Sequence, residues 1–341
     1  MAITGQGTQA DPFVVHSYSE FISLSEHSRI SGTEAVYIKW FDEPNQVLDC
    51  NTYGTEFTWD EFTTKNPSSE GNNTFYIDLN GATIMNFLIA PGKTMFNPKG
   101  ANNSYACKME VYNGAIRNVF MGSATSKVCG DYVKFSNVSM SVNASGSTVI
   151  PFNGADNLII DNCAMYLTAS TLNASLVKRA RITDTDIELH IANQNQKNIF
   201  GGETDNASTW TSLTGCRIQG KIGGAAISWE SQYGLVFGAS SGSNNGHYGK
   251  ITKLTNCDID VDLTDSYYDF QGARYQIYRP SNTGDLNTNV FCNSHYPSVG
   301  ESKAYVYPSD WNYMSHSLMR NGAYLNNQGF TVVEVVETNE G

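Results

Sequence analysis

The sequence predicts an all-β chain folded as a solenoid, in which short strands stack coil upon coil. Three observations support this prediction. A corner residue followed by an alternating strand recurs along the chain, the copies are spaced at near-regular intervals, and a second column of phenylalanines keeps the same register. Such a pattern is typical of stacked repeats that each contact only their neighbours.

The recurring motif is clearest between Leu254 and Leu263, which reads LTNCDIDVDL. After the Asn-Cys pair, Ile259 and Val261 alternate with aspartates. Alternation with a period of two predicts a strand with one buried face and one solvent face. Similar segments are LTGCRIQGKI from Leu213, ITDTDIELHI from Ile182, IDNCAMYLTA from Ile160, FSNVSMSV from Phe135, VYNGAIRNVF from Val111 and DLNGATIMNF from Asp78.

The corner residue of each copy is Asn, Asp or Gly, and its position measures the repeat. The corner residues are Asn80, Asn113, Asn137, Asn162, Asp184, Gly215 and Asn256. The steps between them are 33, 24, 25, 22, 31 and 41 residues. A short step that recurs and sometimes lengthens predicts stacked coils with loop insertions.

A second column supports the same register. It places Phe96, Phe152, Phe200, Phe237 and Phe291 in one row, within segments such as VIPFNG and NIFGGE. Two independent columns that agree favour a solenoid over coincidence. With roughly ten coils at about 4.8 Å each, the stack would be on the order of 50 Å long.

The segment IDLNGATI (Ile77–Ile84) and the corner-plus-strand units after it resemble the right-handed parallel β-helix family. That family includes pectate-lyase-like enzymes, bacteriophage tailspikes and other phage fibre or virion proteins. The resemblance covers roughly Phe75 to Phe291 and implies a right-handed parallel β-helix with a short helical cap at the N-terminus and a cap at the C-terminus. It specifies architecture more than activity, because this fold carries unrelated functions.

One solenoid domain with a cap at each end is therefore predicted. Its parts are an N-terminal cap in residues 1–34, the β-helix in residues 35–297 and a C-terminal cap or tail in residues 298–341. Loop insertions are expected at 238–249, which is rich in glycine and polar residues, and at 264–284.

The N-terminal cap is expected to contain a short helix. Ser17 and Glu20 form a capping-box pattern for a helix that reaches about Leu24, with Phe21 on its buried side. Such a helix would cover the open first coil, whose edge would otherwise invite association. The aromatic segment 45–69 is expected to be irregular and either to pack over the first coils or to form a contact surface.

Composition and charge exclude several function classes. The chain is 40% hydrophobic and 16% charged, with a net charge of -12. An acidic chain repels phosphate, which argues against a nucleic-acid partner. No stretch has the length of a membrane span, and the segment MAITGQGTQADPF lacks the basic start and apolar core of a signal peptide.

The seven cysteines form no CxxC pair. Cys163, Cys216 and Cys257 share the position directly after the corner, which predicts buried residues stacked on their like. A metal site would need denser clustering with histidine or carboxylate help, so no metal and no cofactor is expected. Free thiols favour assembly in a reducing cytoplasm.

Aligned coils place charged residues in outward columns. These columns are Asp186, Arg217 and Asp258; Glu188, Gln219 and Asp260; and His190, Lys221 and Asp262. Carboxylates two apart on a strand lie about 7 Å from each other and those on adjacent coils about 4.8 Å, spacings that bracket both glycosidase geometries. Three interpretations remain open: an exposed salt-bridged face, a contact surface, and a catalytic groove that uses Asp186, Glu188, Asp258 and Asp260.

The second candidate site is the tyrosine-rich insertion 264–284. Tyr267, Tyr268, Tyr275 and Tyr278, together with Trp229, could form an aromatic patch. Flat amphipathic rings stack on sugars and occur at protein interfaces. The same rings could instead hold the long loop against the coils, so packing, a protein interface and glycan binding all remain open.

The resemblance predicts a non-enzymatic structural or attachment protein of a bacteriophage virion: a tail fibre or spike-like, head-decorating or baseplate-associated component. It implies a homotrimer, other virion proteins as partners, host cell-surface polysaccharide as a ligand, and assembly in the host cytoplasm. Tailspikes carry separate particle-binding and trimerising domains, and neither is evident here. The alternative is a polysaccharide-cleaving hydrolase or lyase that acts on an outer face.

Overall fold

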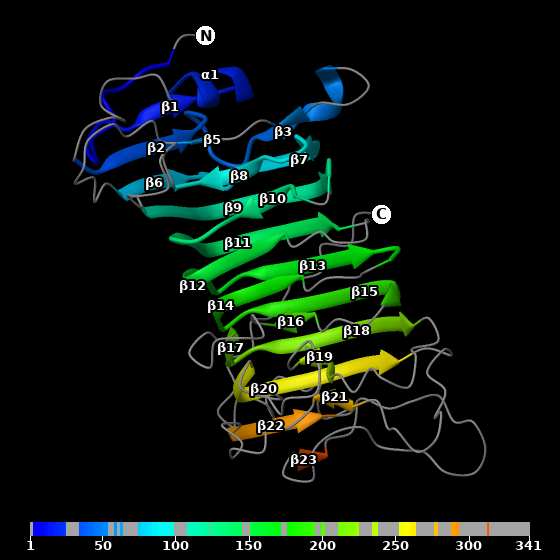
Figure 1. Ribbon diagram of the computed structural model, residues 1–341. Coiled ribbons are helices and arrows are strands. Elements are labelled where there is room, and N and C mark those ends of the chain that lie inside the picture. The colour runs from blue at the N-terminus through cyan, green and yellow to red at the C-terminus, as the bar shows by residue number, and fades with distance from the viewer. Residues whose placement is uncertain are drawn as a thin grey trace.

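The computed structural model describes residues 3–24, 34–53, 58–59, 62–63, 74–98, 108–123, 125–144, 151–171, 176–194, 199–201, 211–224, 234–237, 252–263, 276–278, 288–292 and 312–313. Apart from helix α1 (Tyr18–Ser23) and the 3₁₀ turn η2 (Cys50–Tyr53), the elements in these residues are β-strands. Every pairing between these strands is parallel; the isolated bridge between Thr4 and Val14 is antiparallel. Figure 1 shows the strands stacked one below the next in chain order. The prediction of an all-β chain is confirmed.

The parallel pairings form three ladders, and we call one level of the stack a rung. The first ladder contains the strand segment that precedes each corner residue. Its strands are β1 (Phe13–Val15), β2 (Val36–Trp40), β6 (Thr74–Asp78), β9 (Lys108–Met121), β11 (Val133–Asn143), β12 (Phe152–Asp161), β14 (Val177–Thr183), β17 (Thr211–Thr214) and β20 (Thr252–Leu263).

The second ladder contains the segment that follows each corner. The long strands β9, β11 and β20 pass through the corner and belong to both ladders. The other members are β3 (Val47–Asp49), β7 (Thr83–Ile89), β13 (Ala164–Ala169), β15 (Asp186–Gln194), β18 (Arg217–Gly224) and β22 (Thr288–Cys292), with β4 (Thr58–Trp59) beside the end of β7 and β23 (Asn312–Tyr313) beside β22.

The third ladder pairs short strands with the first parts of β12 and β14. The short strands are β5 (Phe62–Thr63), β8 (Thr94–Asn97), β10 (Lys127–Cys129), β16 (Phe200–Gly201), β19 (Gly234–Phe237) and β21 (Gln276–Tyr278). Adjacent rungs are thus hydrogen-bonded along three ladders.

Apolar columns from the ladders fill the interior. The first column runs through Ile38, Ile77, Val111, Phe135, Ile160, Ile182, Leu213 and Leu254, and the second through Ile84, Ile116, Met140, Met165, Ile187, Ile218 and Ile259. Phe135 joins the first column to the third, because its ring meets those of Phe96 and Phe152 edge to face at 5.9 and 6.4 Å. Burial of these side chains is the main stabilising contribution to the stack.

The predicted phenylalanine row is correct at four of its five positions. Phe96, Phe152, Phe200 and Phe237 lie in the third ladder, with Cys129 and Val177 between the first three. Phe291 was placed wrongly, because it pairs with Asp258 in the second ladder. Tyr278 takes the position opposite Phe237, since the insertion 264–284 supplies strand β21.

The N-terminal helix is confirmed. The Ser17 hydroxyl accepts a hydrogen bond from the backbone N–H of Glu20 at 3.3 Å, which caps α1. Phe21 stacks on Phe62 with ring centroids 4.3 Å apart and touches Trp40 at 5.2 Å. The helix therefore packs on the aromatic side chains of the first rungs.

The segment 45–69 is more regular than the sequence suggested. Asn45 has a positive φ of 60°, like a corner residue, and β3 follows it and pairs with β7. Phe62 then pairs with Phe96 in the third ladder. The described part of this segment is thus another rung. Its polar and aromatic residues do not alternate regularly, so the sequence did not predict its strands.

The described strands can be compared with the predicted domain boundaries at the N-terminal end, and much less so at the C-terminal end. The first ladder begins at β1, within the segment 1–34 assigned to the N-terminal cap. The insertion 238–249 and, apart from β23, the segment 298–341 lie outside the described residues. Among the described residues, no helix is long and apolar enough to cross a bilayer.

Candidate functional site

The corner column, which joins the first ladder to the second, is the most regular feature of the surface. All seven predicted corner residues have a positive φ, from 46° at Asp184 to 66° at Gly215. This left-handed region admits glycine freely and Asn or Asp at modest cost, because a short polar side chain can hydrogen-bond locally. The corner sequence is therefore explained by backbone geometry.

Asparagine side chains at three corners hydrogen-bond to the preceding rung. The Asn137 amide donates to Oδ1 of Asn113 at 3.0 Å, and the Asn80 amide donates to the carbonyl of Phe41 at 3.2 Å. Asn113 is in turn 3.5 Å from Oδ1 of Asp78. The result is a line of amide groups along one edge of the stack.

A second, shorter amide line lies within the second ladder. The Asn118 amide donates to Oδ1 of Asn86 at 2.9 Å, and the Asn86 amide donates to Oδ1 of Asp49 at 2.8 Å. Both asparagines have a positive φ, 51° and 62°. The two amide donations received by Asp49, from Asn86 and from the N–H of Asn51, lower the pKa of its carboxyl.

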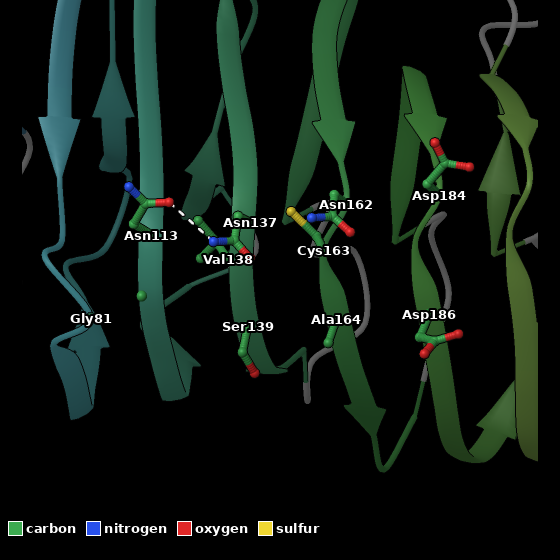
Figure 2. Close-up of a pocket in the computed structure, with 11 residues that line it drawn as sticks. Gly81, Asn113, Asn137, Val138, Ser139, Asn162, Cys163, Ala164, Asp184 and Asp186 are labelled. Carbon is green, nitrogen blue, oxygen red and sulfur yellow. Dashed lines mark hydrogen bonds between the residues drawn. The ribbon is translucent and has the colours of Figure 1, made fainter. Parts of the chain in front are cut away.

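A shallow groove of about 410 Å³ follows the corner column. Figure 2 shows Asn113, Asn137, Asn162 and Asp184 in one row across neighbouring strands. A second row below them contains Ser139, Ala164 and Asp186. The groove offers amide donors and acceptors at rung spacing, with carboxylates at one end.

The thiol in this groove is not poised for nucleophilic chemistry. Burial raises the pKa of Cys163 to about 11, so its side chain is a thiol at neutral pH. Its Sγ donates to the carbonyl of Asp161 at 3.2 Å. The five cysteines whose side chains the structure describes are buried and free: Cys50, Cys129, Cys163, Cys216 and Cys257.

The predicted charged columns are confirmed in register. Asp186 pairs with Arg217 and Arg217 with Asp258, while Glu188, Gln219 and Asp260 follow in the next column and His190, Lys221 and Asp262 in the third. The four candidate carboxylates thus occupy two neighbouring columns on the outward side of the second ladder.

The expectation of an exposed, salt-bridged face is wrong at its C-terminal end. Asp258 is only 2% exposed and Asp260 8%. The one ion pair between described residues of the first column is the 3.8 Å contact of Arg217 Nε with Asp186 Oδ1. Among the residues that the structure describes, neither carboxylate oxygen of Asp258 has a hydrogen-bond partner. Register predicts which residues are neighbours, but depth depends on what the rest of the chain covers.

Burial changes the protonation of these carboxyls. Desolvation raises the pKa of Asp258 to about 7, against the opposing effect of Arg217 and with a further increase from Asp260 and Asp186. Desolvation also raises the pKa of Asp186, and Arg217 opposes the shift. Asp258 is therefore about half protonated near neutral pH.

A mixed cluster lies on the exposed part of the same face. The His190 ring nitrogen Nε2 is 2.6 Å from Oε1 of Glu188, and the His190 ring is 5.0 Å from that of Tyr166. Tyr166 is 40% exposed. Sequence reasoning missed Tyr166, although its place in the strand after corner Asn162 marks it as outward-facing.

Most of the predicted aromatic patch is not described. Tyr267, Tyr268, Tyr275 and Trp229 lie outside the described residues, and of Tyr278 only the backbone, in β21, is placed. Within the described ranges, no group of three or more His, Cys, Asp or Glu residues could hold a metal ion.

Comparison of the sequence with models of protein families found no match, and neither did comparison with curated proteins. Function must therefore be argued from the geometry of the stack, its corner column and its outward faces.

The corner geometry leads to a stability prediction at Asn137. We expect Asn137→Ala to lower the free energy of unfolding by about 1–2 kcal/mol. Alanine is strained in the left-handed backbone conformation and has no side-chain amide whose hydrogen bond would compensate for this strain. Asn137→Gly should cost less, since glycine adopts this φ without strain. Urea unfolding followed by circular dichroism would measure both, and equal losses would show that the amide contact, not the backbone, decides the effect.

Proposed function

We propose that this chain is a right-handed parallel β-helix and serves as a non-enzymatic structural or attachment protein of a bacteriophage virion. A tail fibre or spike-like, head-decorating or baseplate-associated component fits this role. The observation that carries the proposal is the stack itself. In-register parallel pairing continues from β1 to β22, around one apolar interior, with polar groups on the outward faces.

Such a stack suits a protein that binds its partners along an extended, rigid surface. Each rung is paired with its neighbours along three ladders, so the outward columns hold fixed spacings of about 4.8 Å. The interior columns contain the large side chains Phe96, Phe135 and Phe152, fully or almost fully buried. A rigid surface binds partners at low entropic cost, which is what an attachment protein needs.

The partners of this role are further copies of the chain, other virion proteins and a host-surface polysaccharide. We propose that the glycan contacts lie at Tyr267, Tyr268, Tyr275, Tyr278 and Trp229, because aromatic rings stack on the apolar faces of sugars. The reduced, buried state of the described cysteines supports assembly in a reducing compartment such as the host cytoplasm.

A second candidate is a polysaccharide-cleaving hydrolase or lyase. It is favoured by one observation, the pKa of about 7 for Asp258, because a carboxyl protonated at neutral pH can act as a general acid. Asp186 or Glu188 would supply the second carboxylate. The burial of Asp258 weighs against this candidate, since a general acid must reach the leaving group.

One experiment separates the two. The purified full-length chain is screened against host capsular and surface polysaccharides, and both binding and release of reducing ends are measured. We expect binding without release. The double variant Tyr267→Ala, Tyr268→Ala should weaken binding at least about tenfold, since each stacked ring contributes on the order of 1 kcal/mol. Phe120→Ala, which removes a 44% exposed aromatic ring elsewhere, is the control and should bind normally.

Two results would overturn the proposal. Reducing ends released by the wild type but not by the double variant Asp258→Ala, Asp260→Ala would establish the enzyme. A protein that stays monomeric at micromolar concentration and is absent from particles would remove the structural role.

A further inference from the structure

The corner column separates two outward faces whose residues follow a fixed spacing. We call the outward side of the first ladder face one and that of the second ladder face two. From the Asn113 rung onward, residues that flank the corner at similar distances on one rung are seven apart in the chain. These pairs are Glu110/Arg117, Lys134/Ser141, Ile159/Tyr166, Arg181/Glu188 and Ser212/Gln219.

The chemistry of these pairs is complementary rung by rung. Glu110/Arg117 and Arg181/Glu188 join opposite charges, and Ile159/Tyr166 joins an apolar side chain to an aromatic one. The two remaining pairs contain at most one charge. No pair brings like charges together, which would oppose contact between the faces.

The pairs next to the corner are also compatible. They are three residues apart: Tyr112/Ala115, Ser136/Ser139, Asp161/Ala164, Thr183/Asp186, Thr214/Arg217 and Thr255/Asp258. Each contains at most one charged residue, and the largest side chain, Tyr112, stands opposite an alanine. Face one therefore matches face two in size as well as in charge.

Within a single copy, Arg117 and Arg181 do not pair with the acidic residues that lie level with them across the corner. Arg117 and Arg181 are exposed, and neither side chain forms an ion pair with a described residue. Glu110 pairs with Lys134 at 3.0 Å, and Glu188 with His190 at 2.6 Å, both on their own faces. Two exposed guanidinium groups thus lie level with acidic groups across the corner.

We propose that face one of one copy packs against face two of the next, with the stacks parallel and the rungs level. Arg181 then meets the partner's Glu188, Glu110 meets the partner's Arg117, and Ile159 meets the partner's Tyr166. The contact extends over the rungs from Glu110 to Ser212, roughly 20 Å at 4.8 Å per rung. Asp260 is buried by the chain itself, which ends the contact there.

This inference rests on the proposed homo-oligomer and specifies its interface. Contact between two different faces is heterologous, and level rungs add no translation along the stack, so repetition forms a closed ring and not a filament; the proposed homotrimer is such a ring. The corner edges would meet at the ring axis, and the groove lined by Asn113, Asn137 and Asn162 would be enclosed there. Amide groups suit that position, because they can donate and accept without carrying charge to the axis, whereas at the next corner the Asp184 carboxylates of the copies would meet there.

A charge-swap experiment tests the interface. The full-length wild type and the variants Arg181→Glu, Glu188→Arg and the double Arg181→Glu, Glu188→Arg are compared by sedimentation and light scattering. Each single change places like charges in every interface and should weaken association at least about tenfold. The double change restores opposite charges and should recover the wild-type mass. Lys127→Glu reverses a charge on the third ladder and should leave assembly unchanged.

The outcomes are distinct. Circular dichroism checks that each variant folds, which is expected because Arg181 is exposed and Glu188 partly so. An oligomer unaffected by Arg181→Glu, or not recovered by the double change, overturns this interface and leaves the proposed function standing. A monomeric wild type overturns both the interface and the homo-oligomer.

Discussion

Gly220→Ala is expected to destabilise the stack by more than about 4 kcal/mol, enough to prevent folding of the C-terminal rungs. Gly220 has a φ of 130°, a backbone conformation that residues with a side chain rarely adopt. A Cβ there would lie 2.0 Å from the carbonyl oxygen of Leu189 and 2.8 Å from its carbonyl carbon and nitrogen. Leu189 is held by parallel pairing on both sides, so its backbone cannot yield.

Gly130→Ala is the matched control for this change. A Cβ at Gly130 would meet no atom within 4 Å, so its effect should stay within about 0.5 kcal/mol. Soluble yield and urea unfolding of both variants would measure the difference. If the two variants unfolded at the same urea concentration, the close approach of the strands at Gly220 would be wrong.

Asp258→Asn is expected to make the protein more stable at pH 8 by up to about 4 kcal/mol and to leave its stability nearly unchanged at pH 4. The folded pKa of about 7 lies above the ordinary value of 3.8. Between these values the folded state keeps a proton that the unfolded state has released. The free energy of unfolding therefore falls as pH rises through this window, and the loss is complete above pH 7.

The asparagine variant removes the titration of Asp258 and its coupling to Asp186 and Asp260, and leaves the more distant groups unchanged. The amide keeps the shape of the side chain without a charge to desolvate. Urea unfolding of wild type and variant at pH 4, 6 and 8 should give curves that diverge as pH rises. A constant difference across the three pH values would mean that Asp258 is solvated or paired in the folded state.

Gly220 and Asp258 lie on strands whose register was predictable from the sequence. The close backbone contact at Gly220 and the burial of Asp258 were not predictable. The sequence marks Gly220 only as a break in the alternation of LTGCRIQGKI, opposite Leu189 and Val261 in neighbouring strands. The close approach at Gly220 depends on how the backbone bends there. Asp258 alternates like an ordinary outward aspartate, yet other parts of the chain cover it.

The corner residues show how far local reasoning reaches. The seven corner residues from Asn80 to Asn256 were identified as one column from the recurring motif and its spacing, and each has a positive φ. The signal was readable because a left-handed residue restricts the amino acids that can occupy it. Asn45 was missed, since the strand after it has only three residues and no clear alternation.

In the candidate site, too, the alignment of residues was predicted from the sequence and their burial was not. The carboxylates Asp186, Glu188, Asp258 and Asp260 were correctly aligned, because a ladder preserves sequence period. Their exposure was predicted wrongly at Asp258 and Asp260. The groove along the corner and the match between faces one and two were also missed, because both require knowing that residues before and after a corner lie on adjoining surfaces.

For this protein, sequence alone determined the all-β class, the rung spacing, the corner column and which side chains point inward, since each follows from periodicity and from residues that tolerate one backbone conformation. Only the tertiary structure decided depth and proximity: the burial of Asp258, the contact at Gly220 and the level placement of Arg181 with Glu188. Those properties depend on chain segments far apart in sequence, and no local pattern records which segment will cover another.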